Sequence, residues 1–159
     1  MRNRIVGTAA LMLASCLPVV VSAEEIALRV AGNGEVSTLD AHRASATSDK
    51  TVVGWLYNGL VRFRPGSADP NDLEPDLAER WETSPDGKVW TFHLRKGVKF
   101  HGEWGTLGAD DVVYSLQRSA DPKRSTFSSD FAALDKVEKV DELTVRITLK
   151  YPDVNFLGR

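Results

Sequence analysis

The chain has 159 residues, of which 42% are hydrophobic and 26% are charged. This is the composition of a globular domain, and it excludes a disordered or fibrous chain. The formal net charge is −2 and no run of like charge reaches five residues, which excludes a nucleic-acid-binding face or a polybasic membrane segment and favours a small soluble partner.

The first 23 residues have the pattern of a secretory signal peptide. Arg2 and Arg4 give a positive start, an apolar run follows, and small residues end at Ala23. We therefore expect export, with cleavage after Ala23. The alternative is a lipoprotein, because Cys16, the only cysteine, ends a Leu-Ala-Ser-Cys sequence that resembles a lipobox. The apolar residues after Cys16 favour cleavage, since a lipidated start usually leads into a polar tether.

Two elements are predicted in the first part of the exported chain. Alternating apolar residues indicate a strand over 25–31. Apolar residues at helical spacing indicate a helix over 47–57, with Ser48 or Asp49 as its N-cap. Asn58 and the glycine after it are expected to end this helix.

A short strand, a loop and a hairpin are expected next. The strand covers 60–63, and the Pro-, Gly- and Asp-rich residues 64–76 predict an ordered surface loop. The Ser-Pro-Asp-Gly sequence at 84–87 predicts the turn of a β-hairpin over 80–95. Alternation in its second arm places three apolar residues on the buried face: Trp90, Phe92 and Leu94.

The last predicted elements are a helix and a second hairpin. Helical spacing covers 109–120, and Asp121-Pro122 ends it. The hairpin covers 137–150 and is expected to bury Val145, Ile147 and Leu149. Because 151–159 shows no closing element, we expect an incomplete domain that leaves this apolar face uncovered.

One long segment resembles a known family. Residues 76–101, with the sequence DLAERWETSPDGKVWTFHLRKGVKFH, resemble the signature of the peptide/nickel-type extracellular solute-binding proteins, family 5. Ala41 departs from the family pattern, which usually has proline there, and the turn at 102–108 also differs. Three other segments resemble the family in the same order: 37–42, 56–61 and 109–115.

The resemblance implies a fold of the α/β class. Residues 24–159 are expected to form the N-terminal part of the first lobe of a two-lobed periplasmic binding protein, truncated at its C-terminus. Such a lobe is type II-like, in the group with an extra subdomain, and has a mixed sheet with short helices and β-hairpins.

The resemblance also implies a function: the substrate-binding component of an ABC importer, which captures a peptide or related small solute in the periplasm and delivers it to a membrane permease. No catalysis and no cofactor are implied. The protein is expected to contact the membrane only through the permease, or through a lipid on Cys16 if it is a lipoprotein. The sequence leaves open whether the solute is a peptide, a sugar, an opine or a metal chelate. The alternatives are a truncated fragment that binds nothing and a periplasmic enzyme lobe.

Four residues are implied as ligand contacts. The segment after the Leu-Asp pair, which is Ser45, Ala46 and Thr47 here, pairs its backbone with an extended ligand in the family, and Phe127 matches an aromatic residue that approaches the ligand. No metal ligands and no catalytic residues are predicted, because the three histidines lack metal-ligand spacing and no serine lies in a G-x-S-x-G turn.

Overall fold

The computed structural model describes residues 27, 29–32, 34–67, 69 and 72–158, so the predicted signal peptide lies outside the described residues. The elements below all lie within residues 32–159, which form one compact unit. The strand predicted over 25–31 is wrong for its described residues, none of which is in a strand. A strand requires a hydrogen-bonded neighbour, which alternation of apolar residues does not supply.

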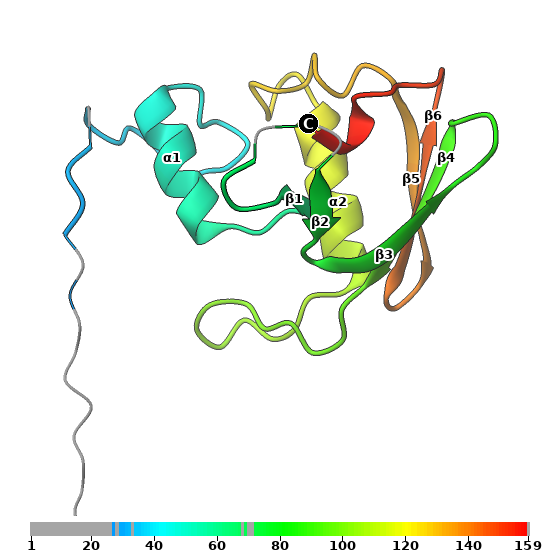
Figure 1. The fold of residues 1–159 in the computed structure, drawn as a ribbon, viewed down its shortest axis with the longest axis horizontal. Helices are drawn as coiled ribbons and strands as arrows, with labels where there is room; N and C mark the ends of the chain where they lie inside the picture. Colours follow the sequence, from blue (N-terminus) through cyan, green and yellow to red (C-terminus); the bar gives the residue numbers. More distant parts are fainter. Residues whose placement is uncertain (1–26, 28, 33, 68, 70–71, 159) are drawn as a thin grey trace, which may run out of the picture. The chain divides into compact units, whose positions relative to one another are not determined.

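A four-stranded antiparallel sheet forms the centre of this unit, in the order β3-β4-β6-β5 (Figure 1). The predicted first hairpin is confirmed: the N–H of Gly87 donates to the carbonyl of Ser84 at 2.9 Å, and Gly87 has a φ of +68°. The second hairpin is also confirmed, with its first strand starting three residues earlier than expected. The strands are β3 Ala78–Thr83, β4 Val89–Leu94, β5 Leu134–Asp141 and β6 Thr144–Leu149.

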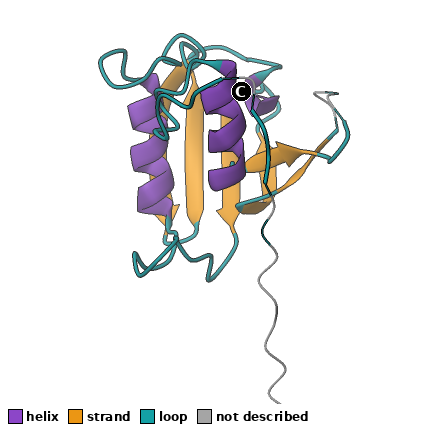
Figure 2. Ribbon diagram, turned by 90° about the vertical axis from the view of Figure 1, so that its left-hand side faces the viewer, coloured by secondary structure: helices purple, strands orange, loops and turns teal. Residues whose placement is uncertain are grey.

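Helix α2, Ala109–Ala120, packs on one face of this sheet, with its axis along the strands (Figure 2), and has the predicted bounds. It buries Val112 against the sheet, and a carboxylate oxygen of Asp111 accepts the N–H of Gly108 at 2.8 Å at its start. The expectation of an uncovered hairpin face is wrong. The face belongs to a buried hydrophobic cluster that includes Val112 of α2 and Ala133. The three residues concerned are almost fully buried: Val145 (0%), Ile147 (0%) and Leu149 (2%).

A small second sheet lies in a region that the sequence predicts as loop. Strand β1, Val61–Phe63, agrees with the predicted strand, and β2, Leu73–Pro75, pairs with it in antiparallel register. The loop prediction is therefore wrong at β2. Its composition favours a turn, but pairing with β1 and the 2.6 Å ion pair between Arg62 and Glu74 hold it extended.

Helix α1, Thr47–Leu56, is confirmed, but its ends differ from the prediction. The N-cap is Ala46, because Ser48 instead donates to the carbonyl of Glu35 at 2.9 Å. Asp49 is also no cap, since it accepts two bonds from Ser37. At the C-terminus the helix ends at Leu56, one residue earlier than predicted. The next residue, Tyr57, is extended, with a φ of −123°.

A 3₁₀ helix, η1, Phe156–Gly158, is the last described element, in a stretch where the sequence predicted none. The ring of Phe156 lies 5.6 Å from that of Trp90 and shields it. The α/β class is confirmed. A mixed sheet, with parallel and antiparallel pairs, was also expected. Every pairing among the described strands is antiparallel, so that part of the prediction is wrong for them. No described helix is both long and apolar enough to cross a membrane.

Candidate functional site

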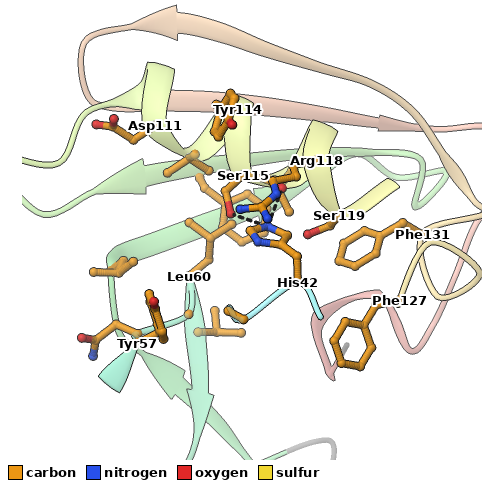
Figure 3. A pocket seen from close by; sticks show the side chains of 18 of the residues that line it. His42, Tyr57, Leu60, Asp111, Tyr114, Ser115, Arg118, Ser119, Phe127 and Phe131 are labelled. Carbon is orange, nitrogen blue, oxygen red and sulfur yellow. Dashed lines mark hydrogen bonds between the residues drawn. The ribbon is translucent and has the colours of Figure 1, made fainter. Parts of the chain in front are cut away.

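A pocket of about 760 Å³ opens between the loop before α1, the residues that lead from α1 into β1, α2 and η1 (Figure 3). Phe92 and Ile147 of the central sheet form its floor, and Phe127 and Phe131 contribute aromatic rings at one side. Most of the lining is apolar. The polar residues that line it come mainly from the loop before α1 and from α2: Asp40, His42, Tyr57, Asn58, Asp111, Tyr114, Ser115, Arg118, Ser119 and Asp130.

An ion pair between Asp40 and Arg118 joins the loop before α1 to α2. Asp40 also accepts the backbone N–H of His42 at 3.0 Å. Burial acts to raise the pKa of Asp40, but the hydrogen bond from His42 and the charge of Arg118 outweigh it, so its pKa lies below the usual value. The carboxylate is therefore held charged in the folded protein.

The imidazole of His42 adds a second link between the same two elements. Its Nε2 lies 3.1 Å from the carbonyl oxygen of Ser115 and 3.3 Å from the Ser115 hydroxyl (Figure 3). A carbonyl oxygen only accepts, so Nε2 carries the proton in this arrangement. Asp40 and His42 together fix the start of the loop that leads into the predicted ligand segment.

The predicted ligand segment is exposed and lies directly before and at the start of α1. Ser45, Ala46 and Thr47 are all solvent-exposed, and Ala46 is extended, with φ −72° and ψ 150°. Among the described residues none of their three N–H groups donates a hydrogen bond within the protein. These groups are therefore available to an extended ligand, and the contact itself stays a prediction.

Phe127 is far from this segment in the sequence but close to it in the fold. The backbone N–H of Thr126 donates to the carbonyl of His42 at 2.9 Å, and the Thr126 hydroxyl lies 3.3 Å from the same oxygen. A second contact joins the same two regions, because the ammonium of Lys50 lies 5.3 Å from the centre of the Phe127 ring. All four predicted contact residues are thus brought to one locality.

The sequence analysis missed Lys50 and the link between Asp40 and Arg118. The sequence did contain a signal for Lys50. A lysine in the first turn of a helix is disfavoured by the helix dipole, which indicates a role other than helix stability. The contact between Asp40 and Arg118 spans 78 positions, and spacing alone offers no signal for it.

The remaining histidines lie in separate places. His93 lies 3.2 Å from Glu82 on the sheet, and the Nε2 of His101 lies 3.3 Å from the carbonyl of Leu56. In the described part of the chain, no three His, Cys, Asp or Glu side chains are grouped as metal ligands would be. Trp104, in the turn that departs from the family pattern, is 85% exposed and lies outside the pocket.

Comparisons with known proteins agree with one another. The family model described as bacterial extracellular solute-binding proteins, family 5 Middle, matches residues 72–159. The curated Di/tripeptide-binding protein 4 of Pseudomonas aeruginosa is 37% identical over 93% of this chain. The structure of MoaA from A. tumefaciens R10, in complex with mannopinic acid, superposes with a TM-score of 0.75 and 55% identity over 77% of this chain.

A third relative is the ABC transporter-associated periplasmic binding protein DppA from Helicobacter pylori, in complex with the peptide STSA. It superposes with a TM-score of 0.66 and 32% identity over 77% of this chain. The match covers 30%, 25% and 27% of these three relatives in turn, so the chain spans less than a third of the length of each. The relatives are solute-binding proteins, and the chain shares the fold of their matching part.

Proposed function

The chain belongs to family 5 of the bacterial extracellular solute-binding proteins, and we propose that it supplies one wall of a site that captures a peptide or related small solute in the periplasm. The solute is then delivered to the permease of an ABC importer. The chain binds and carries out no reaction. Its first 23 residues act as the export signal, with cleavage after Ala23.

One observation carries this proposal: the exposed segment 45–47 lies next to Phe127 through the bond between Thr126 and His42. An extended backbone with unused N–H groups beside an aromatic ring suits a solute that has peptide groups and apolar parts. The N–H groups of the segment bind carbonyl oxygens of the solute, and the ring of Phe127 covers an adjoining apolar part. The link through Asp40, His42 and α2 holds the segment in place before the solute arrives.

A proline substitution tests this backbone contact without disturbing the helix. Thr47 is the first residue of α1, where proline is well tolerated, and the ψ of 150° at Ala46 suits the residue before a proline. Thr47→Pro removes one N–H group, and Thr47→Val is the matched control because it keeps that group. The probe is an N-acetylated, C-amidated trialanine, which has peptide groups and no charge, titrated into the ¹⁵N-labelled chain and followed by NMR.

We expect the probe to shift the amide signals of 45–47 in the parent and in Thr47→Val. In Thr47→Pro the affinity falls about threefold to tenfold, the loss of one hydrogen bond. Equal affinity in Thr47→Pro and Thr47→Val contradicts the backbone contact. Probe binding elsewhere, with no shift at 45–47, contradicts the proposed site.

A further inference from the structure

Lys50 is held beside the predicted ligand segment by an aromatic contact. Its ammonium lies 5.3 Å from the centre of the Phe127 ring, and the side chain is exposed. The backbone that carries the ring is held by two hydrogen bonds: the N–H of Phe127 donates to the Ser125 hydroxyl at 3.0 Å, and the N–H of Thr126 donates to the carbonyl of His42 at 2.9 Å. The positive charge therefore lies in solvent beside the segment, in contact with the Phe127 ring.

No carboxylate of the described chain neutralises this ammonium. The neighbouring Asp49 is only 1% exposed and accepts the N–H and the hydroxyl of Ser37 at 2.7 and 2.6 Å. Lys139 shows the contrast, since its ammonium lies within 2.8 Å of both Asp110 and Glu142, which raise its pKa to about 12. Among the described residues Lys50 has no ion pair and no hydrogen bond through its ammonium.

The helix itself does not account for a lysine at this position. Lys50 is in the first turn of α1, where the helix dipole favours acidic side chains and disfavours a cation. The contact with the Phe127 ring favours a cation over a neutral side chain, but the face of the ammonium away from the ring remains open. An exposed cation that lies against a ring and has no ion pair among the described residues is suited to an anionic group of a ligand.

We propose that Lys50 binds a carboxylate of the solute, so that the solute captured at this wall is an acid, such as a peptide with a free C-terminus. The inference rests on the proposed function, because it places the carboxylate beside a solute backbone that lies along 45–47. Phe127 then has two roles, in covering the solute and in directing the ammonium of Lys50.

Two probes that differ in one group test the inference. N-acetyl-dialanine ends in a carboxylate, and its C-terminal amide has the same backbone without the charge. Both are titrated by NMR into the labelled parent chain and three variants. Lys50→Met removes the charge and keeps a flexible side chain that packs on an aromatic ring. Lys50→Arg keeps the charge, and Lys96→Met removes an exposed charge in the turn after β4.

We expect the parent to bind the acid about fivefold more tightly than the amide, with the acid shifting the side-chain signals of Lys50 and the ring signals of Phe127. The preference disappears in Lys50→Met and persists in Lys50→Arg and Lys96→Met. The inference is overturned if both probes shift 45–47 with equal affinity, or if Lys50→Met keeps the preference, and in either case the proposed function stands. If neither probe shifts 45–47 at any concentration, the proposed function fails and the inference fails with it.

Discussion

The backbone N–H of Thr126 donates a 2.9 Å hydrogen bond to the carbonyl oxygen of His42, across 84 positions of sequence. This bond places the loop after α2 against the loop before α1. Phe127 lies on the first loop, and the segment 45–47 runs from the end of the second loop into the start of α1. The site therefore depends on how these two loops are joined, which gives the first prediction.

Asp40→Asn should weaken the contact between the loop before α1 and α2, because it removes the charge that pairs with Arg118. We expect a loss of about 1 to 2 kcal/mol in the free energy of unfolding at neutral pH, measured by urea denaturation. Glu79→Gln, which changes an exposed carboxyl on β3, is the control and should have little effect. A variant of Asp40 as stable as the parent contradicts a structural role for the ion pair.

The same variant should show a defined pH dependence. The pKa of Asp40 is lower in the folded than in the unfolded chain, so its stabilising effect is present above the unfolded pKa of about 3.9. That effect is lost as the pH falls through the lower folded value. The difference in unfolding free energy between parent and Asp40→Asn should therefore shrink below about pH 4. A difference that stays constant with pH assigns the effect to something other than this charge.

The two aromatic residues of β4 should respond differently to substitution. Phe92 is 1% exposed at the centre of the core, so Phe92→Ala should cost about 3 to 5 kcal/mol. Trp90 is half-buried, and among the described groups its buried indole N–H has no hydrogen-bond partner. Trp90→Phe keeps a ring against Phe156 and removes that N–H, so its thermal melt should lie close to that of the parent. A large loss in Trp90→Phe would show that the indole N–H is bonded.

Two glycine-to-alanine changes should have opposite signs. Gly87 has a φ of +68° in the hairpin turn, so Gly87→Ala should destabilise the protein by about 1 to 2 kcal/mol. Gly54 lies inside α1 with open space where a Cβ would be placed. Gly54→Ala should therefore stabilise the helix by about 1 kcal/mol. Chemical denaturation of both variants checks the pair, and a destabilised Gly54→Ala would mean that α1 packs more closely there than the structure indicates.

The N-cap of α1 links helix stability to the candidate site. Ala46 caps the helix without a side-chain hydrogen bond, so Ala46→Asp should supply one and slow amide hydrogen exchange at Lys50 and Thr51. The new carboxylate also stands near Lys50, and it should reduce the preference for N-acetyl-dialanine over its amide. Ala46→Ser is the matched control, because it caps the helix without a charge. A stronger acid preference in Ala46→Asp would contradict the role given to Lys50.

The sequence predicts best where a local pattern decides the structure. Helix α2 has its predicted bounds because apolar spacing, acidic residues in its first turn and Pro122 after its end all agree. Strand β2 was missed because it has three residues and depends on pairing with β1. The caps of α1 were wrong because Ser48 and Asp49 bind partners 12 or 13 positions away, which a local rule does not include.

The candidate site was predictable only through family resemblance. Ser45, Ala46, Thr47 and Phe127 carry no pattern that joins them, and their proximity follows from the bond between Thr126 and His42. The alanine at the N-cap and the lysine in the first turn are both poor choices for helix stability. Such local departures are expected at a functional site, and they mark this helix start in the sequence.

Photo-crosslinking tests the central claim most directly, because it reports where a solute lies. A tripeptide with a p-benzoylphenylalanine side chain and a free C-terminus is irradiated with the purified chain, and mass spectrometry maps the labelled residues. We predict labelling at 43–50 and 126–131 that unlabelled trialanine suppresses. Labelling concentrated on the exposed aromatic residues Trp55 and Trp104, or labelling that trialanine does not suppress, would contradict the proposed solute wall.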